Sequence, residues 1–368
     1  MRGLRAVLRK EWTQMFRDQW TLRMAFVIPI LELVLFGLID TNVHHVPTAV
    51  FDQSRTPESR QLVQDLVNTG YFEIRSLPGS AEDVRREIVA GKTSVGVLIP
   101  PDFARRRLNG EPADFQVLID GSDSTISSQT LAAASGVAFQ RSLEEIAARA
   151  HVTDLPLRLH PLLLFNPDSR SANLLIPGLI AILLTFSATF LAAFGIVKER
   201  ERGTLEQLMV TPVSPAAVVI GKLLPYLALA FAQLIVILIL MATLFRVPIH
   251  GSVALLFGLS TIYLFSLLAL GLLVSSRAKT QMEAIQRAQV ILLPSFLLSG
   301  YFFPISSLPA WLRPMAYVLP ATYYIKIARG IIIRGAGFVD LWPSVAALVA
   351  ISAILVAAST RAFKKTIG

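Results

Sequence analysis

Six long runs of apolar residues are the feature that most restricts how this chain can fold. The first covers residues 20–40, and five more follow after a long gap, at about 173–197, 217–245, 252–275, 284–303 and 343–361. A helix needs roughly 20 mostly apolar residues to cross the hydrocarbon core of a bilayer. The sequence therefore predicts an α-helical polytopic membrane protein with six transmembrane helices.

Residues 44–170 interrupt the apolar pattern and are rich in charged side chains. Short β-rich segments at 47–51, 71–77, 94–99 and 114–119 alternate with helical segments at 58–68, 81–90, 102–108 and 125–150. This alternation predicts an α/β domain inserted between transmembrane helices 1 and 2. The chain contains no cysteine, so the domain must fold without disulfides.

Basic residues beside the apolar runs predict the orientation, because cytoplasmic flanks carry the excess of Lys and Arg. With the N-terminus inside, 16 basic residues flank the spans on the inner side: Arg2, Arg5, Arg9, Lys10, Arg17, Arg23, Lys198, Arg200, Arg202, Lys222, Arg277, Lys279, Arg287, Arg361, Lys364 and Lys365. Five lie in the short outer loops: Arg246, Arg313, Lys326, Arg329 and Arg334. Both termini are therefore expected in the cytoplasm, including the tail 362–368, and residues 44–170 outside it.

The N-terminal segment 1–19 has the pattern of a helix lying in the headgroup layer. Leu4, Leu8 and Trp12 share one side, and basic residues cover the rest. A plain basic flank is the alternative. The following apolar run has no small-x-small cleavage site after it, so we expect an uncleaved first span and not a signal peptide.

No catalytic, cofactor or metal constellation can be recognised. The tripeptide Gly91-Lys92-Thr93 lacks the earlier glycine of a phosphate-binding loop, because Arg86 stands there, and it fits a helix end capped by glycine. The five histidines match no metal-site spacing. The net charge of +9 fits loops at an anionic membrane surface, and no nucleic-acid motif accompanies it. The sequence thus predicts a protein that is not itself an enzyme.

One inner loop, 198–222, predicts a short helix with defined ends. Gly203 permits a sharp entry, Thr204 can cap the helix, and Pro212 prevents its continuation. The side chains of Leu205, Leu208 and Met209 then share one face. Two interpretations stay open: the apolar stripe fills a groove in a partner protein, or it lies on the headgroups.

Glu32 stands in the middle of the first span, where an ionisable group costs about 2.5–3.5 kcal/mol on insertion scales. Two hypotheses follow. Glu32 is a contact for a polar or cationic substrate, or it is a protonated acid that hydrogen-bonds to a neighbouring helix.

The segment KERERGTLEQLMVTPVSPAAVVIGKLLPY, starting at Lys198, resembles the coupling-loop signature of ABC type-2 transporter permeases, in the bacterial multidrug-exporter branch with a large extracytoplasmic domain. The segments FDQSRTPESRQLVQDL, LIDGSDST, FNPDSRSANLLIPGLIA and LLSGYFFPISSLPAWLRPMAYVLPATYYI resemble the same branch in the same order. The resemblance covers essentially the whole chain.

This resemblance implies the transmembrane subunit of an exporter in the bacterial inner membrane, moving an amphipathic drug-like or lipid-like substrate outward. ATP and Mg²⁺ would bind to a separate ATPase subunit, and a second permease copy or paralogue would complete a dimer. A periplasmic membrane-fusion protein is a further expected partner. The alternative is a membrane-anchored extracytoplasmic ligand-binding or assembly protein without transport.

The resemblance also assigns roles to parts of the segment 173–361. Residues 301–335 would form short re-entrant helices on the outer side; an exposed loop with an aromatic belt is the alternative. Residues expected to transmit the work of the ATPase, together with Met209 of the apolar stripe, are Glu199, Glu201, Gly203, Thr204, Leu205, Glu206, Leu208 and Pro212.

Overall fold

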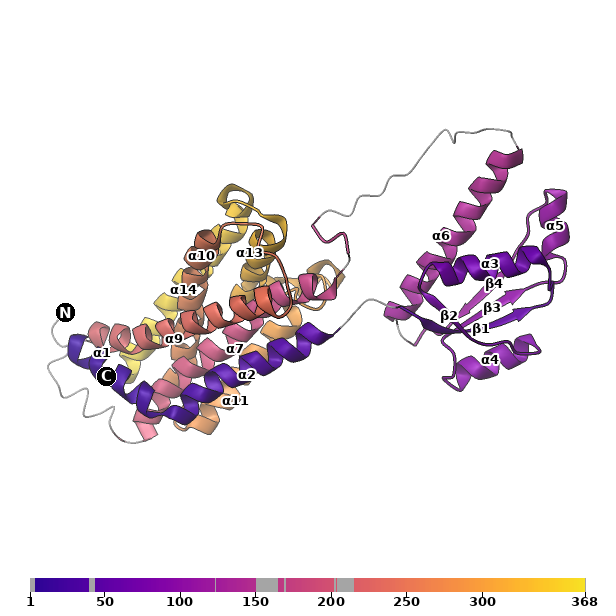
Figure 1. Cartoon of the computed structure of the whole chain (residues 1–368). Helices are drawn as coiled ribbons and strands as arrows, with labels where there is room; N and C mark the ends of the chain where they lie inside the picture. The colour runs from indigo at the N-terminus through magenta and orange to yellow at the C-terminus, as the bar shows by residue number, and fades with distance from the viewer. Residues whose placement is uncertain are drawn as a thin grey trace. The chain divides into compact units, whose positions relative to one another are not determined.

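The computed structural model describes residues 4–39, 44–122, 124–149, 165–168, 170–201, 203 and 215–367. The chain divides into two compact units. A helical unit comprises Met1–Asp40 and Leu163–Gly368, and a second unit comprises Thr41–Leu162. Figure 1 shows the elements of both.

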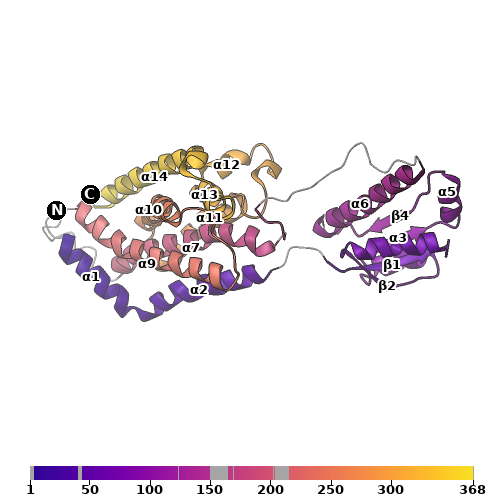
Figure 2. The same cartoon turned by 45° about the horizontal axis from the view of Figure 1, so that its top comes forward.

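The helical unit is built of long helices joined by short connections. In chain order they are α1 (Leu4–Arg17), α2 (Gln19–Leu38), α7 (Ser171–Glu201), α9 (Pro215–Thr243), α10 (Val253–Arg277), α11 (Gln281–Leu298), α12 (Arg313–Val318), α13 (Pro320–Arg334) and α14 (Phe338–Ile367), with a 3₁₀ turn η1 (Ile305–Ser307) before α12. Helix α1 and the last turns of α14 lie at the same end of this unit (Figures 1 and 2).

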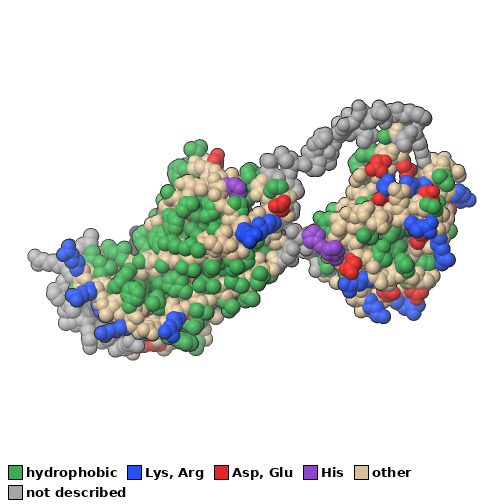
Figure 3. All heavy atoms as spheres, in the orientation of Figure 1, with side chains coloured by type: hydrophobic (Ala, Val, Ile, Leu, Met, Phe, Trp, Pro, Cys, Tyr) green, Lys and Arg blue, Asp and Glu red, His purple; other side chains and the backbone are tan. Residues whose placement is uncertain are grey.

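Among the described helices, five are long and apolar enough to cross a membrane: Gln19–Leu38, Ser171–Glu201, Ile220–Thr243, Val253–Ser276 and Phe338–Ala362. The prediction of a polytopic helical membrane protein agrees with these five. The predicted span 284–303 overlaps α11, whose first turns carry Gln281, Glu283 and Arg287, so this helix does not meet the same criterion. Figure 3 shows hydrophobic side chains over most of the visible face of the helical unit.

Helix α7 lies at the centre of the helical unit. Of its most apolar stretch 71% is buried, compared with 17% for α2 and 22% for α14. Figure 2 shows α7 and α10 between α2 on one side and α14 on the other. The two central helices approach closely at Gly271, where an added methyl group would lie 2.5 Å from the carbonyl oxygen of Thr189. Small residues allow such close contacts between membrane helices.

Two tyrosines in the core of the helical unit have partners for their hydroxyl groups. The rings of Tyr263 and Tyr324 stack with centroids 4.1 Å apart. The hydroxyl of Tyr263 donates to the carbonyl of Ala181 at 2.9 Å, and the hydroxyls of Ser260 and Tyr324 are 2.6 Å apart. Such pairing is required where no water is present to satisfy a buried polar group.

Residues 301–335 contain the 3₁₀ turn η1 and the two short helices α12 and α13. Pro314 and Pro320 stand in the first turns of α12 and α13, where the missing N–H of proline costs nothing. Helix α13 is packed into the core, and Tyr324 is fully buried. Arg329 of α13 donates to the carbonyl of Tyr301 at 3.2 Å, just beyond the end of α11. The position of these helices in a membrane stays a prediction.

Helix α1 packs on the helical unit through a face other than the Leu4, Leu8 and Trp12 side that is predicted to enter the headgroup layer. Its buried residues are Val7 and Glu11, and it lies against α9. Trp12 and Phe16 are exposed, 45% and 51% respectively, and stack edge to face 5.6 Å apart. Trp12, one of the side chains predicted to enter the headgroup layer, is thus exposed, whereas Leu4 and Leu8 are half-buried.

The second unit contains a four-stranded sheet with the strand order β2-β1-β3-β4. The strands are β1 (Val46–Asp52), β2 (Phe72–Ser76), β3 (Val95–Ile99) and β4 (Gln116–Ile119); β1 is parallel to β2 and β3, and β4 is antiparallel to β3. In the central pairing Thr48 lies opposite Val95. Helices α3 (Pro57–Asn68) and α6 (Ser124–Arg149) cover one face of the sheet and α4 (Ala81–Val89) the other, while α5 (Phe103–Asn109) precedes β4 (Figure 1).

Local signals in the sequence explain these elements. Thr56 caps α3 through a reciprocal pair of hydrogen bonds with Ser59, one turn into the helix. At the end of α4, Gly91 has a positive φ of 67°, and the Lys92 N–H donates to the carbonyl of Glu87 at 2.9 Å. This geometry confirms the prediction that Gly91 ends a helix.

Candidate functional site at the end of α7

The last turn of α7 carries four consecutive charged residues, Lys198, Glu199, Arg200 and Glu201. Successive side chains on a helix point about 100° apart, so four in a row face four directions. Because α7 is central, each direction leads to a different neighbouring segment. This charged turn is the point at which the apolar core of the helical unit meets the loop 198–222.

Glu199 lies in a cluster of four charged residues, of which Glu11, Glu199 and Lys222 are buried and Lys10 is exposed. Lys222 of α9 places its Nζ 2.6 Å from Glu199 Oε2 and 2.9 Å from Glu11 Oε1, and Lys10 of α1 also pairs with Glu199. Glu199 and Lys222 are only 2% and 1% exposed. Two acids and two bases leave the cluster neutral, which is the arrangement that makes burial of charge tolerable. The cluster joins α7, α1 and α9.

Glu11 completes the cluster from α1. Burial raises the pKa of the Glu11 carboxyl against the opposing attraction of Lys222. Its side chain is also 3.7 Å from Lys10. The first helix of the chain is therefore held to α9 by a charged contact as well as by the packing of Val7, which an added methyl group at Gly221 would approach to 2.7 Å.

Lys198 pairs with Asp18, the residue between α1 and α2. Asp18 caps α2 by accepting a hydrogen bond from the Thr21 N–H at 3.2 Å. Partial burial would raise the pKa of Asp18, but the hydrogen bonds from Lys198 and Thr21 outweigh it and hold this pKa below its ordinary value. The side chain of Lys198 thus links the end of α7 to the residue that caps α2.

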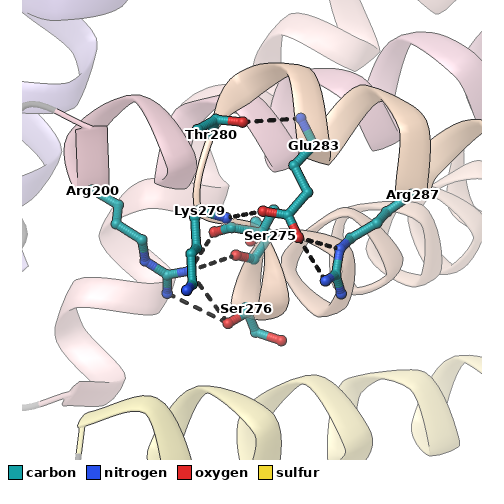
Figure 4. A network of polar contacts seen from close by, with 8 residues as sticks. Arg200, Ser275, Ser276, Lys279, Thr280, Glu283 and Arg287 are labelled. Carbon is teal, nitrogen blue, oxygen red and sulfur yellow. Dashed lines mark hydrogen bonds and ion pairs between the residues drawn. The ribbon is translucent and has the colours of Figure 1, made fainter.

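Arg200 points to the end of α10 (Figure 4). Its guanidinium donates to the carbonyl of Ser275 at 3.3 Å, to that of Ser276 at 3.4 Å, and to that of Ala278. The last carbonyls of a helix lack partners within the helix and carry partial negative charge. The guanidinium of Arg200 therefore both donates hydrogen bonds to these carbonyls and compensates their charge.

Glu201 binds the start of α11. Its Oε1 accepts from the backbone N–H of Gln281 at 2.7 Å, and its Oε2 accepts from the side-chain amide of the same residue. Thr280 caps α11 by accepting from the Glu283 N–H at 3.2 Å, and Glu283 accepts in turn from the Lys279 N–H at 2.7 Å (Figure 4). The connection between α10 and α11 is therefore well ordered by local hydrogen bonds.

The chain turns immediately after this charged segment. Gly203 has a φ of 68°, a left-handed conformation that favours glycine, as its predicted role at a sharp entry requires. The remaining predicted residues, Thr204, Leu205, Glu206, Leu208, Met209 and Pro212, lie outside the described residues. Glu199 and Glu201 lie just before that segment, where Glu199 pairs with Lys222 and Glu201 binds Gln281.

A groove of about 450 Å³ lies beside the charged turn, between α2, α7 and α11. Its walls are mainly apolar and aromatic, with Phe186, Phe190 and Phe194 one turn apart along α7. The rings of Phe190 and Phe194 stack with centroids 5.7 Å apart. This volume is in the range of pockets that take drug-sized ligands.

Glu32 lines this groove and is half-buried. Among the described residues, none forms a hydrogen bond or ion pair with its carboxylate. The structure therefore offers no helix partner for Glu32 within the described part of the chain, and it places the carboxylate where a bound molecule would meet it. Gln281, the partner of Glu201, lines the same groove.

Several residues of this site were not anticipated. The sequence indicated Lys10, Arg200 and Lys222 only as basic flanks, and it indicated no role for Glu11 or Gln281. One signal was present for two of them: Glu11 is the single acid in α1, and Lys222 interrupts an otherwise apolar helix. A charge in such a position commonly has a partner of opposite sign.

Among the described residues, no three histidine or acidic side chains gather as a metal site would need. His151 and His160 lie outside the described residues. The charged turn of α7 instead makes ion pairs and helix-end hydrogen bonds.

The chain is similar to known transport proteins over nearly its whole length. It is 28% identical over 98% of both chains to YbhR of Escherichia coli K12, which is named as a multidrug ABC transporter permease. It is 29% identical to YbhS of the same organism, named in the same way, over 91% of this chain and 89% of YbhS. It is 27% identical to the inner membrane transport permease YhhJ, over 89% of this chain and 87% of YhhJ.

The model of the family described as ABC-2 family transporter protein matches residues 20–361, from the start of the first apolar helix to the end of the last. The match contains the α7 turn, the groove and the inserted segment between α2 and α7. This chain belongs to the ABC-2 family of transporter proteins.

Proposed function

We propose that this chain is the permease subunit of an ATP-driven exporter and that it receives mechanical work at the end of α7. One observation carries the proposal: the four charged residues of the last turn of α7, residues 198–201, join α7 to α1, α2, α9, α10 and α11. A displacement of the segment that follows Gly203 would be transmitted to five helices at once. That is the mechanical property a coupling element needs.

In this proposal the chain has six transmembrane helices, with α11 as the fifth, and both termini are cytoplasmic. The α/β unit then lies outside the cytoplasm, and the protein resides in a bacterial inner membrane. The proposed orientation places the charged turn of α7 on the ATPase side. The excess of basic residues in the loops on that side supports this assignment.

The proposed partners are separate ABC ATPase subunits, which would bind ATP and Mg²⁺, and a second permease copy or paralogue. Helix α2 leaves most of its apolar surface uncovered, including Leu31 and Leu35 at 56% and 57% exposed. Lipid or a second copy would cover this surface. The names of the relatives give no support to a membrane-fusion partner, which is not part of the proposal.

The proposed substrate is an amphipathic drug-like molecule that enters the groove between α2, α7 and α11. The aromatic residues along α7 supply apolar contacts, and Glu32 supplies one negative charge. The relatives YbhR and YbhS are named as multidrug permeases, which supports this class of substrate. No observation favours the alternative of a membrane-anchored binding protein without transport.

The test is purification of the protein from its own membrane, followed by reconstitution into vesicles. We expect an ATPase chain to accompany it and ATP to drive accumulation of an amphipathic dye. The proposal is contradicted if a preparation free of ATPase still transports, or if the complex hydrolyses ATP without moving any amphipathic probe.

A further inference from the structure

The connection between α10 and α11 is held at both of its ends by the last turn of α7. Arg200 binds the carbonyls of Ser275, Ser276 and Ala278 at the end of α10, and Glu201 binds the backbone N–H and the side chain of Gln281 at the start of α11. Two adjacent residues of α7 therefore form hydrogen bonds to two other helices, and Figure 4 shows those of Arg200.

The sign of each charge matches the helix end that it contacts. The C-terminal end of a helix presents free carbonyls and partial negative charge, which Arg200 meets; the N-terminal end presents free N–H groups and partial positive charge, which Glu201 meets. Exchanging the two residues would place both charges at the wrong ends. The two contacts therefore depend on the sign of each charge as well as on its position.

The Glu201 contact also leads directly to the groove. Gln281 and Ile285, one turn apart on α11, both line it, opposite residues of α2 such as Glu32. Only one residue, Arg202, separates Glu201 from Gly203, where the segment predicted to meet the ATPase begins. The side chain of Glu201 therefore connects the start of the segment after Gly203 to Gln281 in the wall of the groove.

We propose that the α10–α11 connection is a second transmission element of this permease. Arg200 and Glu201 make α11 follow the end of α7, so that movement of the segment after Gly203 displaces the α11 wall of the groove. This inference rests on the proposed function, and it assigns positioning roles to Arg200, Glu201 and Gln281.

The test measures substrate transported per ATP hydrolysed by the full permease–ATPase complex in vesicles, with rhodamine 6G as the transported probe. Glu201→Ala, which removes both hydrogen bonds, and Gln281→Ala, which removes only the side-chain one, are each expected to lower this ratio by roughly two- to fivefold, because the contact is solvent-exposed. The double variant should be no worse than Glu201→Ala alone, because Glu201→Ala already removes both hydrogen bonds, whereas Gln281→Ala removes only the side-chain bond and keeps the backbone N–H donor. ATPase co-purification and the rate of hydrolysis should be unchanged.

Two further variants separate positioning from simple damage. Glu201→Gln keeps an oxygen that can accept from the Gln281 N–H and should retain most of the coupling. Gln286→Ala, at an exposed position on the same helix, is the matched control and should behave as the unmodified protein.

The absence of cysteine allows a rescue experiment. In the variant Glu201→Cys/Gln281→Cys, a short bifunctional thiol reagent applied before the ATPase is added would replace the hydrogen bonds by a covalent link. We expect the unlinked variant to be poorly coupled and the linked one to recover.

The inference is overturned if the unmodified complex transports but Glu201→Ala and Gln281→Ala leave the ratio unchanged. It is also overturned if the covalent link abolishes transport, since α7 and α11 would then have to separate during the cycle. Failure of the unmodified complex to transport any probe with ATP would instead defeat the proposed function, and this inference with it.

Discussion

Lys222 Nζ lies 2.6 Å from Glu199 Oε2, and both side chains are almost completely buried where α9 meets α7. The same ammonium group is 2.9 Å from Glu11, so one lysine neutralises acids from two helices that are far apart in the sequence. Lys222→Met would leave two carboxylates close together with only Lys10 beside them. We expect a loss of about 3–5 kcal/mol in the free energy of unfolding, because removing one partner strands buried charge.

Thermal or denaturant unfolding in detergent micelles would measure this loss. Lys279→Met is the matched control, because its side chain is exposed and only its backbone N–H is used, by Glu283. Equal stability of the two variants would contradict the role given to the buried cluster.

Asp18→Asn tests the junction between α1 and α2. The pKa of Asp18 in the fold lies below its ordinary value of 3.8, so below that pH the unfolded chain binds more protons than the folded one. The stabilisation by Asp18 is therefore complete at neutral pH and is lost as the pH falls through 3.8 toward the lower pKa of the folded state. The variant should be less stable at pH 7 and should show a smaller loss on acidification, which unfolding curves at pH 7, 4 and 3 would reveal.

Glu32→Gln tests the charge in the groove. We expect export of a permanent cation such as tetraphenylphosphonium to fall by roughly tenfold, as for the loss of one interaction with a charged group. Export of an uncharged dye such as Nile red should be unchanged. Ser187→Ala, in the same groove, is the control. Full activity of Glu32→Gln with both probes would remove any charge-based role for this residue.

Leu208→Asp tests the segment after Gly203. A charge in the predicted apolar stripe should release the ATPase or uncouple hydrolysis from export, while the helical unit stays folded. Co-purification of the ATPase and transport per ATP are the measurements, and Gln207→Asp, off that stripe, is the control. Normal coupling in Leu208→Asp would favour the interpretation that the stripe only rests on headgroups.

Gly271→Ala tests the close approach of α7 and α10. The added methyl group would meet the Thr189 carbonyl at 2.5 Å and Ala192 Cβ at 2.7 Å, so the helices must move apart, at a cost of about 1–3 kcal/mol. Gly258→Ala on the same helix is a matched control, because an added methyl group there has no described atom within 4 Å. The two variants should differ clearly in unfolding midpoint; identical midpoints would show that the α7–α10 contact is not tightly packed.

Local pattern in the sequence was enough to predict most of the individual elements. Each expected strand and helix between 44 and 150 is present with its ends shifted by at most two residues, because alternation, caps such as Thr56 and glycine stops such as Gly91 act over a few residues. The long apolar helices were equally clear. Helix α11 was less clear from the sequence, because its first turns carry polar side chains that contact other segments, and hydropathy does not predict such contacts.

The partners of the charged turn could not be predicted from the sequence. Glu199 and Glu201 were selected by resemblance, but Lys222 is 23 positions from Glu199, Gln281 is 80 from Glu201, and Glu11 is 188 before Glu199. Nothing in residues 198–201 states which helix each side chain will face. The helix that each side chain contacts depends on the position of α7 among its neighbours, which the packing of the whole helical unit determines.

The charged turn has a consequence for the spacing of the chain itself. Because Lys198, Glu199, Arg200 and Glu201 each reach a different helix, inserting or deleting one residue just before them would turn all four by about 100° and exchange every partner at once. Substitutions at these positions remove one connection at a time. A change of length in α7 is therefore the alteration that this helix end tolerates least, however conservative the inserted residue.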